Sequence, residues 1–155
     1  MGLFTSINIA STGMSAQRLR SDVIADNLAN VNTTRTDEGG PYRRTRVIMR
    51  PRVQQPYWRS PFLPGMLDNG PGAGVRVAAL EKDNSPLREV YDPTHPNRIM
   101  EGPKKDYVLM PNVDVVTEMV DLLEAARAYE ANAQVVEGYK SMFQKALEIG
   151  GRLNR

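Results

Sequence analysis

Residues 39–67 hold the densest group of side chains that could bind a ligand. Tyr42, Tyr57 and Trp58 lie there among arginines, and the segment contains no Asp or Glu. Cationic groups interleaved with aromatic rings are typical of nucleic-acid binding, in which guanidinium groups contact phosphates and rings stack on bases. The arginines of this segment are Arg43, Arg44, Arg46, Arg50, Arg52 and Arg59.

The spacing of these arginines favours a different role. Arg44 and Arg46 alternate with uncharged residues, as on a strand whose charged side faces solvent or another subunit. The formal net charge of the whole chain is only +2, which by itself does not indicate a polyanionic partner. We therefore predict no nucleic-acid partner, and we predict contacts between Arg43, Arg44 and Arg46 and acidic helices of neighbouring subunits.

No pattern in the sequence indicates catalysis. His95 is the only histidine and the chain has no cysteine, which excludes a cysteine nucleophile and histidine clusters. The glycines of residues 70–74 lack the Gly-Lys-Ser/Thr that binds phosphates. Asp121, Glu130 and Glu137 could serve as acids or bases by type, but they do not have metal-ligand spacing. We expect no enzyme activity, no cofactor and no metal site.

Proline and charge divide the chain into three parts. All 11 prolines of the 155 residues fall in 41–111, and the parts before, within and after that segment carry charges of −1, +5 and −2. This distribution predicts an N-terminal helix in 1–33, a central loop and hairpin region in 34–111, and a C-terminal helix in 112–155. Without a run of about 20 apolar residues, direct membrane insertion is not expected.

The last third predicts one long helix over 114–149. Asn112 or Asp114 can accept hydrogen bonds from the first-turn N–H groups, and Gly150 and Gly151 are expected to end the helix. Apolar residues recur in steps of four and three, as in a coiled-coil seam. The predicted packing positions in this helix are Val115, Met119, Leu122, Ala126, Tyr129, Ala133, Val136, Phe143 and Leu147.

Additional rows of apolar residues widen this stripe and predict contact with more than one neighbouring helix. The remaining face, which includes Glu118, Asp121 and Glu124, is predicted to be a solvated surface. The first third shows a similar but weaker pattern of apolar residues at helical spacing. Its predicted packing positions are Ile7, Met14, Leu28 and Val31.

These patterns predict a mainly α fold with a small β part. The two terminal helices should pack as a coiled-coil-like stalk, in an orientation that the pattern leaves open. Short strands are expected at 42–49, 75–80, 87–91 and 107–110, joined as hairpins across turns at 68–71 and 92–96.

Two motifs resemble signatures of the bacterial flagellar rod and hook protein family. Residues 27–33 read Asn-Leu-Ala-Asn-Val-Asn-Thr, and residues 128–132 read Ala-Tyr-Glu-Ala-Asn. Residues 34–44, 91–96 and 110–115 are similar to the proximal rod members of that family. The connection over 57–74 is longer and richer in proline and glycine than the family pattern. The motif residues are Asn27, Leu28, Ala29, Asn30, Asn32, Thr33, Tyr129, Glu130 and Asn132.

The resemblance implies a structural subunit of the flagellar basal body that polymerises through its terminal helices into the periplasmic rod and transmits torque. Implied partners are copies of itself, other rod proteins, and basal-body ring and rod-junction proteins. Export by the flagellar type III apparatus, also implied, agrees with an N-terminus that lacks the positive start and apolar run of a cleaved signal peptide.

Overall fold

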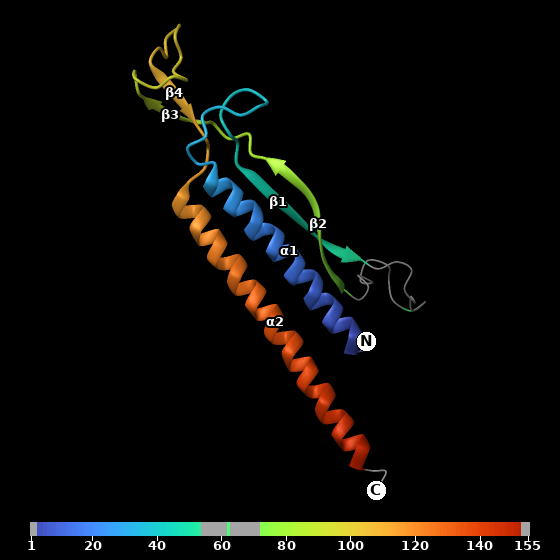
Figure 1. Cartoon of the computed structure of the whole chain (residues 1–155). Coiled ribbons are helices and arrows are strands. Elements are labelled where there is room, and N and C mark those ends of the chain that lie inside the picture. Colours follow the sequence, from blue (N-terminus) through green and yellow to red (C-terminus); the bar gives the residue numbers. More distant parts are fainter. Residues whose placement is uncertain (1–2, 54–61, 63–71, 153–155) are drawn as a thin grey trace. The chain divides into compact units, whose positions relative to one another are not determined.

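The computed structural model describes residues 3–53, 62 and 72–152, and it is mainly α with a small β part, as predicted. The predicted turn at 68–71 lies outside the described residues. Figure 1 shows the elements along the chain. They are α1 (Leu3–Ala29), β1 (Thr45–Val53), β2 (Gly72–Lys82), β3 (Arg88–Tyr91), β4 (Tyr107–Met110) and α2 (Val115–Arg152).

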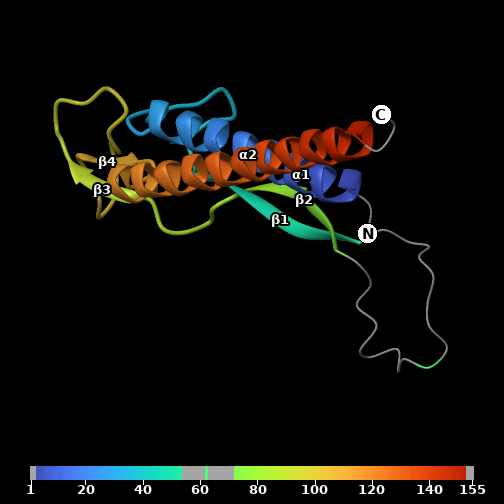
Figure 2. The same ribbon diagram turned by 90° about the horizontal axis from the view of Figure 1, so that it is seen from below.

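The four described strands form two separate two-stranded sheets. β1 pairs with β2, and the two arrows run side by side in opposite directions (Figure 2). β3 pairs antiparallel with β4, with Arg88 opposite Met110 and Tyr91 opposite Tyr107. The rings of Tyr91 and Tyr107 meet edge to face with centroids 5.4 Å apart. Paired hairpin strands were predicted and are confirmed, although β1 starts three residues later than expected.

The chain divides into two compact units. Unit 1 comprises residues 1–18, 49–78 and 125–155, and unit 2 comprises 19–48 and 79–124. Both helices and both strands of the longer sheet contribute residues to each unit.

Small residues allow the two helices to approach closely in unit 1. Ala10, Ala16 and Ala125 are buried. A Cβ at Gly13 would lie 3.0 Å from the Nδ2 of Asn132, so the amide of Asn132 occupies the space that a side chain would need. Gly13 lowers the intrinsic helicity of α1, but its lack of a side chain allows α1 and α2 to pack closely.

The start of β2 packs on α1 in unit 1. The Thr12 hydroxyl donates to the Ile9 carbonyl at 2.7 Å and accepts from the Val75 N–H at 3.2 Å. Gly74 has a φ of +99°, and a Cβ at this position would lie 2.1 Å from the Thr12 Oγ1. Both the backbone conformation and the space therefore require glycine.

The helices pack antiparallel in unit 2. Arg20 contacts Asp121, whereas Asn27, two turns later in α1, contacts Glu118. Antiparallel packing settles the orientation that the apolar pattern left open. Ile24, Val108, Pro111 and Val113 are also buried in unit 2.

Local side-chain hydrogen bonds stabilise the end of α1 and the start of α2. α1 ends at Ala29, inside the predicted 27–33 stretch, and the Asn30 side chain donates to the Asp26 carbonyl at 3.0 Å. The carboxylate of Asp114 accepts from the Val116 N–H and the Thr117 hydroxyl at the start of α2, which confirms the predicted cap. The bond from the Thr117 hydroxyl, followed by that from the Val116 N–H, lowers the pKa of Asp114.

The predicted stop at Gly150 and Gly151 is wrong, because α2 continues to Arg152. Glycine ends a helix when it takes a left-handed conformation, and Gly150 is not among the glycines with positive φ. In a helical conformation glycine only weakens the helix, by about 1 kcal/mol relative to alanine. Within the described residues no helix is both long and apolar enough to cross a membrane.

We predict that Gly74→Ala lowers the free energy of unfolding by at least about 1 kcal/mol, because alanine is strained at this φ and meets the Thr12 hydroxyl. Urea denaturation measures the change. Gly72→Ala is the matched control, since a Cβ there meets nothing within 4 Å. Equal stability of the two variants would contradict this account of Gly74.

Candidate functional site

The side chain of Asn27, in the last turns of α1, is the centre of a buried polar junction in unit 2. Asn27 is 1% exposed. Its Nδ2 donates to the Thr45 carbonyl at 2.9 Å and to the Glu118 carboxylate at 3.1 Å. Its Oδ1 accepts from the Thr45 N–H at 2.9 Å and lies 2.9 Å from the Tyr42 hydroxyl. Both donors and the acceptor oxygen of the amide are thereby used.

Glu118, in the first turns of α2, supplies a fully buried carboxylate to this junction. Its side chain is 0% exposed and accepts from the Nε of Arg44, whose side chain is 19% exposed. Removing an ionised carboxylate from water is costly unless cationic or hydrogen-bonding partners replace the water. Arg44 and Asn27 are those partners, one for each carboxylate oxygen.

The junction extends outward through a second pair of charges. The Nη2 of Arg44 lies 3.0 Å from the Oδ2 of Asp121, and the Nη2 of Arg20 lies 2.8 Å from the Oδ1 of the same carboxylate. Cations and anions thus alternate from α1 through α2 to the residue before β1. We call Arg20, Asn27, Arg44, Glu118 and Asp121 the Arg44 network.

Backbone groups fix the position of Arg44. Its N–H donates to the Asn112 side chain at 2.9 Å, and Asn112 donates to the Asp83 carbonyl at 3.1 Å. The Asp83 N–H returns a bond to the Arg44 carbonyl at 2.7 Å. The sequence offers Asn112 as a possible helix cap. Its side chain instead links Arg44, which precedes β1, to Asp83, which follows β2.

Tyr42 covers one side of the junction. Its hydroxyl lies 2.9 Å from both the Asp26 carboxylate and the Asn27 side-chain oxygen. Burial, and secondarily the neighbouring Asp26, raises the pKa of the Tyr42 phenol above its ordinary value of 10.0. The phenol therefore stays protonated and can continue to donate in mildly alkaline solution.

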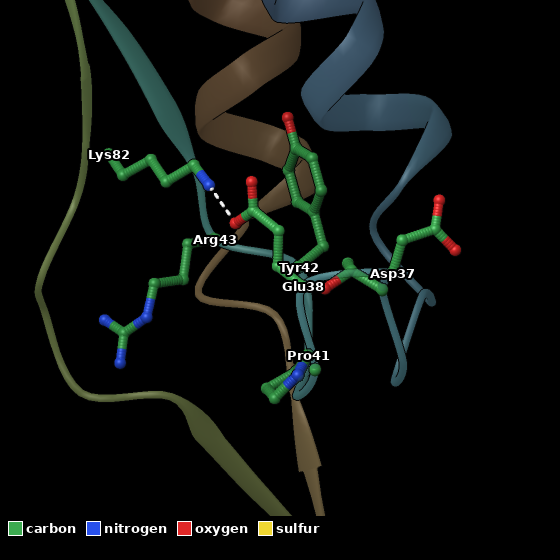
Figure 3. A pocket seen from close by; sticks show the side chains of 8 residues that line it. Asp37, Glu38, Pro41, Tyr42, Arg43 and Lys82 are labelled. Carbon is green, nitrogen blue, oxygen red and sulfur yellow. Dashed lines mark hydrogen bonds and ion pairs between the residues drawn. The ribbon is translucent and has the colours of Figure 1, made fainter.

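Next to Tyr42 lies an open cavity of about 450 Å³, lined by the loop after α1 and by Lys82 (Figure 3). Lys82 and Glu38 form an ion pair at 2.6 Å across it. The hydrogen bond from Lys82 lowers the pKa of Glu38. Among the described residues no group of three or more His, Asp or Glu side chains is placed to hold a metal ion.

The structure corrects the prediction that Glu118 belongs to a solvated face. That prediction followed the apolar seam, but the inward side of α2 runs through the buried Glu118 and Ala125, seven residues apart, and then through the half-buried Asn132. The seven-residue spacing of Glu118, Ala125 and Asn132 is the sequence signal for this inward side of the helix. A search for apolar residues does not detect it, because neither alanine nor asparagine is strongly apolar.

The three arginines predicted to contact neighbours have partners within the chain. Arg44 pairs with Glu118 and Asp121, as described above. Arg46 lies 2.6 Å from the Asp83 carboxylate, and Arg43 donates weakly to the Asp83 carbonyl at 3.4 Å. Contact of these arginines with another subunit stays a prediction, but the charge of Arg44 needs no second chain to be neutralised.

The other motif residues have local roles or lie at the surface. The Asn30 amide oxygen accepts from the Thr33 hydroxyl at 3.1 Å, which stabilises the turn after α1. Asn132 donates to the Ala128 carbonyl at 2.8 Å. Leu28 is half-buried, and Ala29, Asn32, Tyr129 and Glu130 are exposed.

None of the 13 predicted packing residues is fully buried in the single chain, which leaves each of them surface for a neighbour. Their packing against other subunits stays a prediction. Ile7, Met14, Leu28, Val31, Val115, Leu122, Ala133 and Val136 are half-buried, and Met119, Ala126, Tyr129, Phe143 and Leu147 are exposed.

We predict that Arg44→Met lowers the free energy of unfolding by about 3–5 kcal/mol, because it leaves the buried carboxylate of Glu118 without its cation. Glu118→Leu should cost less, because Arg44 keeps Asp121 as a partner. The double variant should be more stable than Arg44→Met, since no buried carboxylate without a cation remains. Chemical denaturation of the four proteins forms a double-mutant cycle. Additive losses would show that the two charges do not depend on each other.

We also predict a specific loss of stability in alkaline solution. Because the pKa of Tyr42 is raised on folding, its contribution is complete below the unfolded pKa of about 10 and is lost as pH rises through the folded pKa. Unfolding measured between about pH 9 and about pH 11 should show a steeper loss in the wild type than in Tyr42→Phe. Parallel losses would contradict this role of Tyr42.

Comparison with known protein families gives matches at both ends of the chain. The family described as "Flagella basal body rod protein" matches residues 7–35, and "Flagellar basal body rod FlgEFG protein C-terminal" matches residues 104–149. Asn27 lies in the first match, and Glu118 and Asp121 lie in the second.

Full-length relatives carry the name "Flagellar basal-body rod protein FlgC". The chain is 62% identical to the one from Borreliella burgdorferi, over 96% of this chain and 98% of the relative. It is 41% identical to that of Bacillus subtilis and 36% identical to that of Salmonella typhimurium, each over 97% of this chain and 99% of the relative. The chain therefore belongs to the FlgC family of flagellar basal-body rod proteins.

Proposed function

We propose that the chain is a structural subunit of the proximal rod of the bacterial flagellar basal body. It polymerises through its terminal helices into the axial shaft that transmits torque from motor to hook, and flagellum assembly and motility require it. The names of its relatives support the assignment to the rod. The observation that carries the proposal of polymerisation is the apolar surface that α2 leaves exposed.

This surface is extensive for a helix that already has a partner. Phe143 is 44% exposed and Leu147 is 60% exposed, and both belong to the predicted seam. A second row, formed by Val116, Val120, Leu123 and Met142, is exposed by 52–68%. Apolar side chains in continuous rows stabilise a protein when a neighbour removes them from water. Two rows on one helix fit contacts with more than one neighbouring subunit.

The three-part division of the sequence belongs to this proposal. Residues 1–33 and 112–155 supply the helices of the polymer, and residues 34–111 supply the loops and strands beside them. The partners are copies of the chain, other rod proteins, and basal-body ring and rod-junction proteins. Export through the flagellar type III apparatus, without a cleaved signal peptide, would deliver the subunit to a periplasmic rod. The role is structural rather than enzymatic.

We predict that Phe143→Asp and Leu147→Asp abolish incorporation into the rod while leaving the single chain folded. Both side chains are exposed, so each change should alter the free energy of unfolding by no more than about 0.5 kcal/mol. In a subunit contact, however, an unpaired carboxylate would be buried. Mass spectrometry of salt- and detergent-washed basal bodies measures incorporation.

Asn84→Asp is the matched control, because Asn84 is also exposed but lies after β2 and not on α2. It should be incorporated like the wild type. Absence of the wild-type chain from basal bodies that contain other rod proteins would refute the rod assignment. Normal incorporation of both seam variants would refute polymerisation through this surface.

A further inference from the structure

The last turns of α2 continue past the start of α1 in unit 1. Gly13 of α1 lies against Asn132 of α2, and the start of α1 and the end of α2 lie at the same end of the unit (Figure 1). From this contact α1 extends about 15 Å to Leu3, whereas α2 extends about 30 Å to Arg152. About 15 Å of α2 therefore has no part of α1 beside it.

The side of α2 that faces α1 keeps its apolar character in this last part. Where α1 lies beside it, this side is half-buried at Ala128, Asn132, Val136 and Tyr139. Phe143, Ala146 and Leu147 continue the same side, within about 60° of Asn132 at 100° per residue. All three are exposed. The burial of this side thus ends where α1 ends, although the apolar residues do not.

These last turns carry a continuous apolar surface. Their large apolar side chains are 44–66% exposed. A Cβ at Gly150 would meet nothing within 4 Å. Small residues at 146 and 150 would let another helix approach closely, as Gly13 does where α1 meets α2. We call Met142, Phe143, Ala146, Leu147 and Ile149 the end patch.

The first turns of α2, in unit 2, carry a second apolar surface. Its side chains are 52–68% exposed and follow one another at the spacing of a helix ridge. They lie about 100–160° around the helix from Glu118, which faces α1 through Asn27. This surface is therefore on the side of α2 away from α1. We call Val116, Met119, Val120 and Leu123 the start patch.

We propose that the end patch of one copy packs against the start patch of a second copy. The inference rests on the proposed rod function and names one contact of that polymer. Two end patches packed on each other would form a symmetric contact, which closes a pair and stops growth. A contact between two different patches leaves one free patch of each kind, so it repeats from copy to copy.

The start patch suits the end patch better than the exposed rings of Tyr91 and Tyr107 on β3 and β4. Tyrosine hydroxyls need polar partners when they are buried, and the end patch has no polar side chain. The start patch is also free of polar side chains. Its helix ridge can pack beside the small residues Ala146 and Gly150, as ridges and grooves do in other helix pairs.

The size of the contact explains how a subunit can stay separate before assembly. Each patch covers only about two helical turns, so the two together bury less than the roughly 1,200 Å² of a stable complex. A single contact should therefore be weak in solution. It becomes effective in a polymer, where each copy makes it together with other contacts.

Cysteine cross-linking in purified basal bodies tests the contact, because the chain has no cysteine of its own. Val120→Cys/Ala146→Cys places one thiol near the centre of each patch. A short bis-maleimide should convert this double variant into dimers, trimers and larger multiples on a denaturing gel. Each single variant should stay monomeric, because the contact brings unlike positions together.

Glu101→Cys/Ala146→Cys is the matched control, since Glu101 is exposed between β3 and β4 and lies outside both patches. It should give monomers only. Met119→Cys/Leu147→Cys is a second pair across the same two patches. It replaces the first pair if mass spectrometry shows that the first double variant does not enter basal bodies.

The proposal is overturned if an incorporated double variant forms no multiples. It is also overturned if Ala146→Cys alone forms dimers, which would show that two end patches meet. Binding of the purified chain to phosphatidylglycerol vesicles, lost in Phe143→Asp and without cross-links in basal bodies, would assign the end patch to a membrane surface instead. In all these cases the rod function stands, whereas absence of the wild-type chain from basal bodies would refute the rod function itself.

Discussion

The fold of unit 2 depends on neutralising the carboxylate of Glu118. This group lies where α1, α2 and the start of β1 meet, and it is fully enclosed. Burial of an ionised carboxylate is unfavourable unless its partners are held in place. Asn27 is held by Thr45, and Arg44 is held by Asn112. One charge therefore makes the positions of three chain segments depend on one another, although those segments are far apart in the sequence.

The same constraint explains why the loop after α1 takes a defined path. Tyr42 and Thr45 must both reach Asn27, which limits the chain between Ala29 and β1 to a compact turn. Gly39 and Gly40 have φ values of +86° and +84°, a conformation that glycine adopts without strain. The Tyr42 N–H closes this loop on the Thr33 carbonyl at 3.0 Å. A polar interaction at the end of a helix thus determines the backbone conformation of a segment with little apolar content.

The sequence predicts the elements better than it predicts their contacts. Helix α2, its Asp114 cap and strand β4 follow from periodicity, proline and capping chemistry, all of which act between near neighbours in the chain. The role of Glu118 depends on Arg44, 74 residues away, and the pattern around Glu118 alone resembles that of any solvated helix face. Asn27 could be singled out by its motif, but its four contacts required the fold. Gly13 was recognisable as a poor helix former, whereas its contact with Asn132 was not.

Among the described residues the interior contains small apolar side chains together with the polar Asn27 and Glu118, whereas many large apolar side chains are exposed. In the single chain α2 buries Glu118 and Ala125, while Phe143 and Leu147 are exposed. Hydrogen bonds and ion pairs are directional, so the interior can specify one arrangement of segments even though it buries few large apolar side chains. Apolar burial is not directional, and it is proportional to the area removed from water. A subunit built in this way can have a defined conformation before assembly and gain most of its apolar burial from its neighbours.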